Sequence, residues 1–170
     1  MTVLRIEMFG PYTLAGHLCQ HSLSPDLREM YFKISNQWRE FAEVAHNLPA
    51  LPPRLGYGIG FSSDDLQKSM TYFCSVVVPG KDVVPSEFFC LELPQLHCAV
   101  FEHHSHVTSI ACTLQSIFTI VLPDAGIRPA AAKANLPSFI QRYSEQFDPE
   151  TGLGGLEILI PIDAREMTAS

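Results

Sequence analysis

The residue with the clearest chemical potential in this sequence is Glu157, which lies within the most hydrophobic stretch of the chain, LEILIPID at 156–163. Burying an unpaired carboxylate costs several kcal/mol or forces it to take up a proton, so its position needs an explanation. One explanation is a solvated strand end just after the glycines at 152, 154 and 155. The other is that Glu157 lies at the bottom of a pocket that binds a cation.

A second group of polar side chains, EHHSH at 102–106, has the composition of a metal site. Catalytic zinc usually needs three protein ligands on a rigid frame. These residues instead straddle the expected end of a strand and start of a helix, so the sequence favours a helix-start region and predicts neither a metal nor another cofactor. No GxSxG motif and no evident cysteine–histidine pair is present, so we predict no catalytic residue.

Composition narrows the class of partner. The chain has 170 residues, of which 46% are hydrophobic and 17% charged, and its formal net charge is −7. This length fits one domain, or two small halves that share a core. The acidic balance and the lack of a basic run argue against nucleic acid or an anionic membrane as a direct partner and mildly favour cationic small molecules. No apolar run is expected to reach membrane-spanning length.

The five cysteines, at 19, 74, 90, 98 and 112, lie in apolar strand-like or helix-like sequence without CxxC spacing. We interpret them as reduced core residues of a cytoplasmic protein, with neither a disulfide framework nor a thiolate zinc site. The N-terminus also lacks the basic segment and apolar core of a signal peptide.

Hydrophobic periodicity predicts strand–strand–helix–strand–strand, twice. Strands are expected at 4–8, 13–20, 57–61, 71–78, 87–93, 97–103, 139–147 and 156–163, amphipathic helices at 24–46 and 105–122, and a polar turn at 62–69. In the third strand Gly58 and Gly60 alternate with apolar residues, which predicts that another group approaches this backbone closely.

The two halves of the chain are related by a shift of 85 residues, which superposes Ile6 on Leu91 and Tyr72 on Glu157. The shared order of elements predicts a single domain built by internal duplication, with repeats at about 1–82 and 83–170. We expect an α+β fold in which one antiparallel sheet carries two main helices. A pseudo-twofold axis would then place Tyr72 and Glu157 symmetrically, lining one cleft between the halves.

Four stretches resemble the GyrI-like effector-binding domain of AraC-type and multidrug-sensing regulators. They are YGIGF at 57–61, LPQLHCAVFEHHS at 93–105, the helix after it, and FIQRYSEQFDPETGLGGLEILIPI at 139–162. The resemblance implies a duplicated βαββ fold with a central ligand cleft. It also implies that drug-sensing members accept lipophilic cations between aromatic walls and a glutamate on the final strand, the position of Glu157. Only three residues precede the first predicted strand, so any DNA-binding unit is expected to be a separate protein or absent.

Together these observations predict a stand-alone cytoplasmic module that binds lipophilic cations for drug sensing, transcription regulation or sequestration. The predicted ligand-binding residues are Glu157, Tyr72, Trp38, Tyr57, Phe61 and Phe101. Each aromatic face adds roughly 0.5–2 kcal/mol by cation–π contact. Core packing remains the alternative for every aromatic except Tyr72. On this interpretation, Glu157→Gln abolishes cation binding and leaves the fold intact or more stable.

Two other functions stay open at this point. One is a hydrolase that detoxifies reactive small molecules, with Glu157 as general base and Tyr72 as its helper. The other is a protein-interaction module similar to the gyrase-inhibitory members of the family.

Overall fold

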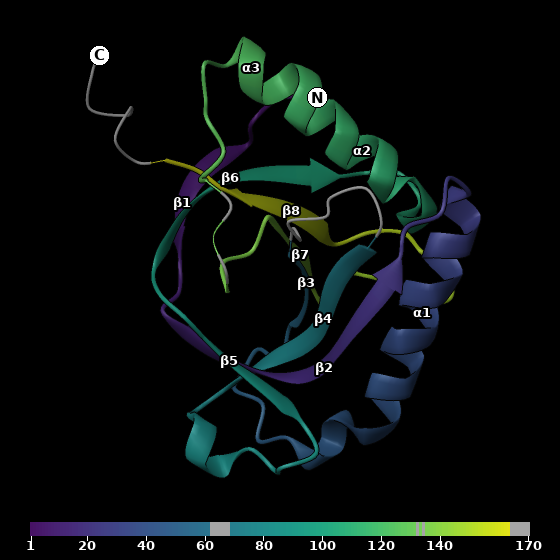
Figure 1. Cartoon of the computed structure of the whole chain (residues 1–170), viewed down its shortest axis with the longest axis vertical. Helices are drawn as coiled ribbons and strands as arrows, with labels where there is room; N and C mark the ends of the chain where they lie inside the picture. The colour runs from purple at the N-terminus through teal and green to yellow at the C-terminus, as the bar shows by residue number, and fades with distance from the viewer. Residues whose placement is uncertain (62–68, 132, 134, 164–170) are drawn as a thin grey trace.

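In the computed structural model, which describes residues 1–61, 69–131, 133 and 135–163, eight antiparallel strands form one curled sheet (Figure 1). The strands are β1 Arg5–Phe9, β2 Tyr12–Ser22, β3 Gly56–Phe61, β4 Ser69–Val78, β5 Phe89–Leu93, β6 Leu96–His103, β7 Phe139–Tyr143 and β8 Leu156–Pro161. The predicted antiparallel α+β fold is therefore confirmed. The polar turn predicted at 62–69 lies almost wholly outside the described residues.

The strand order is β1-β6-β8-β7-β3-β4-β2-β5, which has the symmetry of a duplication. Strands β3 and β7 lie at the centre, and β4, β2 and an edge strand on one side match β8, β6 and an edge strand on the other. The edge strands are exchanged, because β1 pairs with β6 and β5 pairs with β2. Each half supplies strand–strand–helix–strand–strand, as predicted, while the repeat boundary near 82 remains a prediction.

Helix α1, Leu27–Val44, packs on β2 and β4. The Asp26 side chain caps the start of the helix by accepting a hydrogen bond from the Arg28 backbone N–H. This N–H group has no acceptor within the helix itself. The buried Gln37 side chain donates to the carbonyl oxygens of His17 and Tyr72, at 2.9 Å each, and so ties the helix to both strands.

The second helical layer packs on β6 and β8. It consists of η3 Val107–Ser109, α2 Ile110–Ser116, the π-helical turn η4 Ile117–Val121 and α3 Leu122–Asp124. Its buried side chains Ile110, Ile117 and Leu122 contact Phe101 and the outward-facing apolar residues of β8. This layer is the structural counterpart of α1 in the second half.

One helical segment differs from the expectation that no apolar run reaches membrane-spanning length. Val107–Asp124 has a mean hydropathy of 1.4 and is, by length and composition alone, long and apolar enough to cross a membrane. Only 22% of this segment is buried. A single helix of this kind is weak evidence, because core helices of folded proteins pass the same test.

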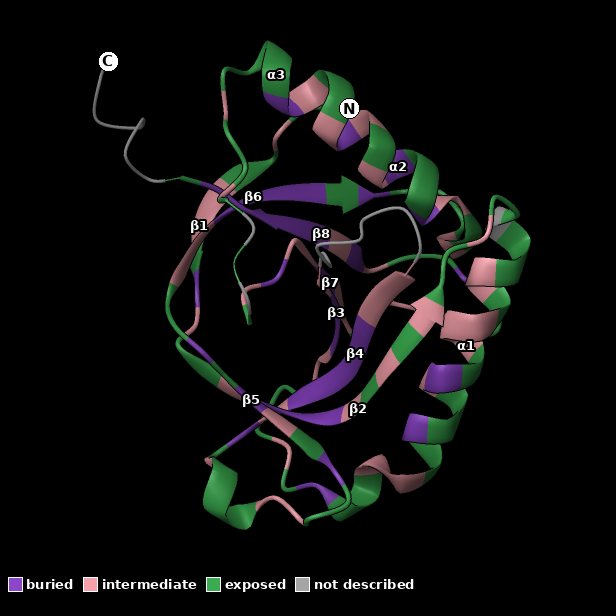
Figure 2. Ribbon diagram, in the orientation of Figure 1, coloured by how far each residue is buried: buried purple, intermediate pink, exposed green. Residues whose placement is uncertain are grey.

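The sheet has two distinct faces. The outer face carries the helices, and β3 and β7 lie between the two helical layers (Figure 1). The inner face closes around a core to which all eight strands contribute, and the strands are buried over much of their length (Figure 2). Its buried members include Phe9, Leu14, Ile59, Phe73, Leu91, Val100, Ile140 and Leu159.

Candidate functional site

At the centre of the outer face, three glycines of β3 lie directly opposite three large side chains of β7. The pairs are Gly56 with Tyr143, Gly58 with Gln141, and Gly60 with Phe139. Residues paired in an antiparallel ladder project to the same face of the sheet. The glycines therefore form a flat strip on which neighbouring side chains can lie.

The absence of a side chain is required at two of these glycines. A Cβ atom at Gly58 would lie 1.9 Å from the Tyr72 hydroxyl oxygen, and one at Gly60 would lie 2.2 Å from the Phe139 ring. Real Cβ atoms do not approach other atoms so closely. The predicted close approach to this strand is thus confirmed, and the approaching groups are aromatic side chains.

We expect Gly58→Ala to destabilise the protein by about 2 kcal/mol, because inserting a methyl group into a packed site forces neighbours from their positions. Urea unfolding measures the change in the free energy of unfolding. The matched control is Gly80→Ala, since a Cβ at Gly80 meets no atom within 4 Å. Equal effects of the two substitutions would show that Tyr72 does not need the space above Gly58.

A chain of hydrogen bonds links the buried polar groups above the glycine strip. Trp38 Nε1 donates to Tyr72 Oη at 3.1 Å, and Tyr72 Oη donates to Gln141 Oε1 at 2.5 Å. Tyr143 Oη also donates to Gln141 Oε1, at 3.2 Å. Four side chains from α1, β4 and β7 therefore converge on one point at the centre of the sheet.

The direction of these bonds fixes the orientation of the Gln141 amide. An indole N–H can only donate, so Tyr72 accepts from Trp38 and must place its own proton elsewhere. The Gln141 oxygen provides that acceptor, whereas a reversed amide would leave the tyrosine proton without a partner.

Both tyrosines of this network remain protonated. Burial raises the pKa of Tyr72 well above its ordinary value, and burial also raises the pKa of Tyr143. Because desolvation disfavours phenolate, these hydroxyls act as donors throughout the accessible pH range. The hydrogen-bonded centre of the site is therefore polar and uncharged.

Half-buried aromatic rings lie around these hydrogen-bonded groups. Trp38 and Tyr143 contact edge to face with ring centroids 5.2 Å apart, and Tyr143 contacts Phe147 in the same way at 4.8 Å. Phe139 lies beside them, over Gly60. We call Trp38, Phe139, Tyr143 and Phe147 the aromatic cluster. It presents apolar, π-rich surface next to hydrogen-bonding groups, the usual composition of a small-molecule site.

The inner face holds a different arrangement, in which two arginines alternate with two glutamates. Arg142 Nη1 lies 2.7 Å from Glu7 Oε1, and its Nε donates to Glu157 Oε2 at 2.8 Å. Arg5 lies 2.8 Å from Glu157 Oε1 and 3.0 Å from Glu7 Oε2. Both oxygens of Glu157 are thus engaged by arginine, and we call these four residues the ion-pair quartet.

The structure separates the six predicted site residues. Trp38 and Tyr72 come together in the outer-face network, and Phe101 lies under the second helical layer. Tyr57 and Phe61 pack against the inner core, and Glu157 belongs to the ion-pair quartet. Their role in ligand binding remains a prediction, but the expected single cleft containing all of them is wrong.

The expected symmetry of Tyr72 and Glu157 is wrong for a specific reason. Tyr72 packs with the residues under α1, on the outer face. In β8 the outward-facing residues are Leu156, Ile158 and Ile160, so Glu157 between them points inward. A shift of one residue in alignment exchanges the two faces of a strand, and the shift of 85 contains that error.

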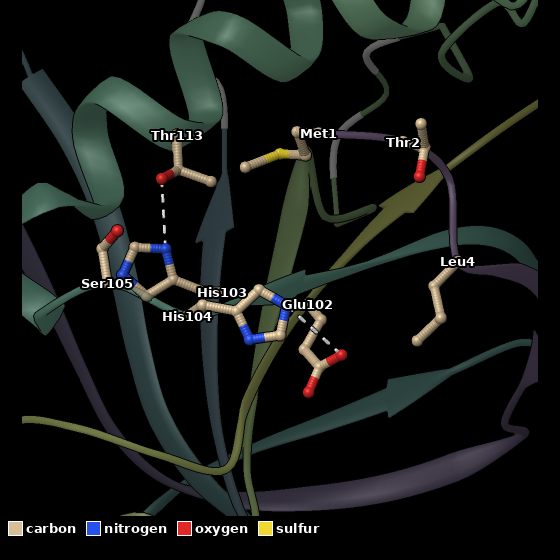
Figure 3. A pocket seen from close by; sticks show the side chains of 8 residues that line it. All are labelled: Met1, Thr2, Leu4, Glu102, His103, His104, Ser105 and Thr113. Atoms are coloured by element: carbon tan, nitrogen blue, oxygen red, sulfur yellow. Dashed lines mark hydrogen bonds and ion pairs between the residues drawn. The ribbon is translucent and has the colours of Figure 1, made fainter.

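The EHHSH segment starts the second helical layer. His106 accepts a hydrogen bond from the Thr108 backbone N–H, and both ring nitrogens of His103 are bonded, to Thr113 and to the His106 carbonyl group. Beside it lies a cavity of about 350 Å³, where His104 contacts Glu102 (Figure 3). Within the described residues no group of three or more His, Cys, Asp or Glu side chains could hold a metal ion.

Comparison with known proteins adds family information to this geometry. Residues 2–163 match the model of the GyrI-like small molecule binding domain. Among curated proteins, no sequence relative was found.

Several solved structures share the fold. The structure of SAV2435 bound to tetraphenylphosphonium is similar with a TM-score of 0.72 and 14% identity, covering 97% of this chain and 96% of that one. An integron cassette protein from the mobile metagenome of Vibrio cholerae has a TM-score of 0.63 and 13% identity, covering 94% and 95%. A proposed bacterial transcription regulation protein from Staphylococcus aureus has a TM-score of 0.61 and 17% identity, covering 94% and 97%. At these identities the likeness shows the fold.

Proposed function

Because the chain belongs to the GyrI-like family of small-molecule-binding domains, we propose that its aromatic cluster binds lipophilic organic cations. The observation that carries this proposal is the group of half-buried rings around Trp38 and Tyr143, which lies between the two helical layers. The face of an aromatic ring attracts a cation through its quadrupole and tolerates many ligand shapes. The bound tetraphenylphosphonium of SAV2435 supports the same ligand class.

The preference for cations should come from aromatic faces and from the net charge of −7. Among the described residues, no carboxylate forms a hydrogen bond or ion pair with a member of the aromatic cluster. This differs from the expected direct pairing of the ligand with Glu157. The charge preference should therefore be moderate, and shape and apolar contact should supply most of the affinity.

We place this binding in the cytoplasm, where the five free thiols would stay reduced. The bound state would serve drug sensing or sequestration. A hydrolase that uses Glu157 as general base receives no support from the site, because arginines engage both oxygens of that carboxylate.

The test exploits the single tryptophan of the chain, Trp38, whose fluorescence reports directly on the proposed site. Tetraphenylphosphonium and tetraphenylborate have nearly the same shape and opposite charge. We expect the cation to change the Trp38 emission saturably and to bind at least tenfold more tightly than the anion. Equal binding of both ions would remove the cation preference, and no binding of either would contradict the proposed function.

A further inference from the structure

We infer that the site recognises a hydrogen-bond acceptor on its ligand, through the amide N–H group of Gln141. This inference rests on the proposed function and specifies the ligand class further. The expected ligand is an aromatic cation whose frame also carries a neutral acceptor, such as a ketone, ester or amide carbonyl oxygen.

The oxygen of the Gln141 amide has hydrogen-bond partners, but its nitrogen has none among the described residues. Its oxygen accepts from both Tyr72 and Tyr143, while its nitrogen forms no hydrogen bond with any described residue. The Gln141 side chain is nearly completely buried, with 4% of the residue exposed. An amide N–H group at such a position is costly to leave without an acceptor.

The Gln141 amide nitrogen is not completely closed off from a partner atom. Every fully buried side-chain nitrogen and oxygen in the described part of the chain has a hydrogen-bond partner. Since Gln141 Nε2 has none, it cannot be fully buried and is accessible to a small partner atom. At least part of this donor group is therefore open to an acceptor beside the aromatic cluster.

The Gln141 amide cannot exchange its oxygen and nitrogen by rotation without losing the hydrogen bonds that its oxygen accepts. Trp38 donates to Tyr72, which leaves Tyr72 as a donor that needs the Gln141 oxygen. Reversing the amide would break this bond and the one from Tyr143. The donor is therefore held in place before any ligand arrives, which lowers the ordering cost of recognition.

The test uses two phosphonium ions that differ only at the acceptor. In (4-acetylphenyl)triphenylphosphonium a carbonyl oxygen replaces the terminal CH₂ group of (4-isopropenylphenyl)triphenylphosphonium, with the same charge and almost the same shape. We expect the unaltered protein to bind the acetyl compound about three- to tenfold more tightly, the range of one net hydrogen bond. This comparison needs no substitution, so it does not depend on the folding of a variant.

Gln141→Glu then assigns the effect to the amide. Glutamate keeps an acceptor oxygen for the two tyrosines but replaces the NH₂ group by oxygen. We expect this variant to lose or invert the preference for the acetyl compound and to bind both cations more tightly. Gln115→Glu adds the same charge at an exposed position of α2 and should leave the preference unchanged.

The outcomes separate the two proposals. If neither phosphonium ion binds, the proposed function fails. If both bind with equal affinity, the proposed function stands and acceptor recognition is overturned. If a folded Gln141→Glu protein keeps the original preference, the acceptor is recognised elsewhere and the role of Gln141 is overturned.

Discussion

Arg142→Met is expected to lower the free energy of unfolding by about 2–3 kcal/mol, the largest stability change among the substitutions considered for this protein. The Arg142 side chain is 16% exposed and pairs with both Glu7 and Glu157. Methionine fills similar volume but leaves two half-buried carboxylates facing each other with only Arg5 between them. Removing one partner of such a group costs more than the pair itself contributes, because the remaining charges stay desolvated.

Urea unfolding at neutral pH measures this effect, with Arg39→Met as control. Arg39 is exposed and hydrogen-bonds only to Asn36 among the described residues, so its replacement should change the free energy by no more than about 0.5 kcal/mol. If the two substitutions have the same small effect, the ion-pair quartet is not a structural element.

The stabilisation should also depend on pH in a defined direction. Burial alone would raise the pKa of Glu7, but its hydrogen bonds and ion pairs with Arg142 and Arg5 lower it below the ordinary value of 4.5. A lowered folded-state pKa contributes stability that is present above pH 4.5 and is lost as the pH falls through the lower folded value. The difference in stability between the unaltered protein and Arg142→Met should therefore shrink in acid.

Much of the fold was predictable because its signals are local. Alternating apolar residues and glycine or proline breaks identify the strands, and helical periodicity identifies both helical layers. The repeated order of elements, from which a duplication is predicted, was also visible in the sequence. The second helical layer differs in detail, since Ile117–Val121 forms a π-helical turn that no residue pattern announces.

The environment of Glu157 could not be predicted, because its partners come from distant strands. Arg5 lies in β1 and Arg142 in β7, and their contact with Glu157 depends on the register of three strand pairs, β1–β6, β6–β8 and β7–β8. Low similarity between the two halves left the alignment uncertain by one residue, which is enough to exchange the faces. The sequence suggested a solvated strand end or a ligand cation for this carboxylate, whereas in the structure its partners are two arginines of the chain.

The importance of Gln141 and Tyr143 was missed, although a signal existed. In FIQRY at 139–143 the large residues at 139, 141 and 143 alternate, and so do the glycines at 56, 58 and 60. An antiparallel pairing of these two segments at the centre of the sheet would have brought the large side chains onto the glycine strip. The strand order confirms that β3 and β7 are the central pair.

Trp38→Leu should lower the affinity for tetraphenylphosphonium about tenfold. Leucine keeps apolar volume on the outer face but removes the largest ring of the aromatic cluster and the donor to Tyr72. A desolvated cation–π contact is worth about 2 kcal/mol or less, and 1.4 kcal/mol corresponds to a factor of ten. Because the substitution removes the fluorescent reporter, titration calorimetry is the appropriate measurement. Unchanged affinity in a folded variant would place the ligand outside the aromatic cluster.

The most direct test compares Trp38→Leu with Glu157→Gln in one calorimetric series with tetraphenylphosphonium. Glu157→Gln should keep the affinity within about twofold while lowering the free energy of unfolding by about 1–2 kcal/mol, since it weakens the pairs with Arg5 and Arg142. Trp38→Leu should lose affinity. The reverse pattern, with binding abolished by Glu157→Gln and retained by Trp38→Leu, would contradict a ligand site on the outer face of the sheet.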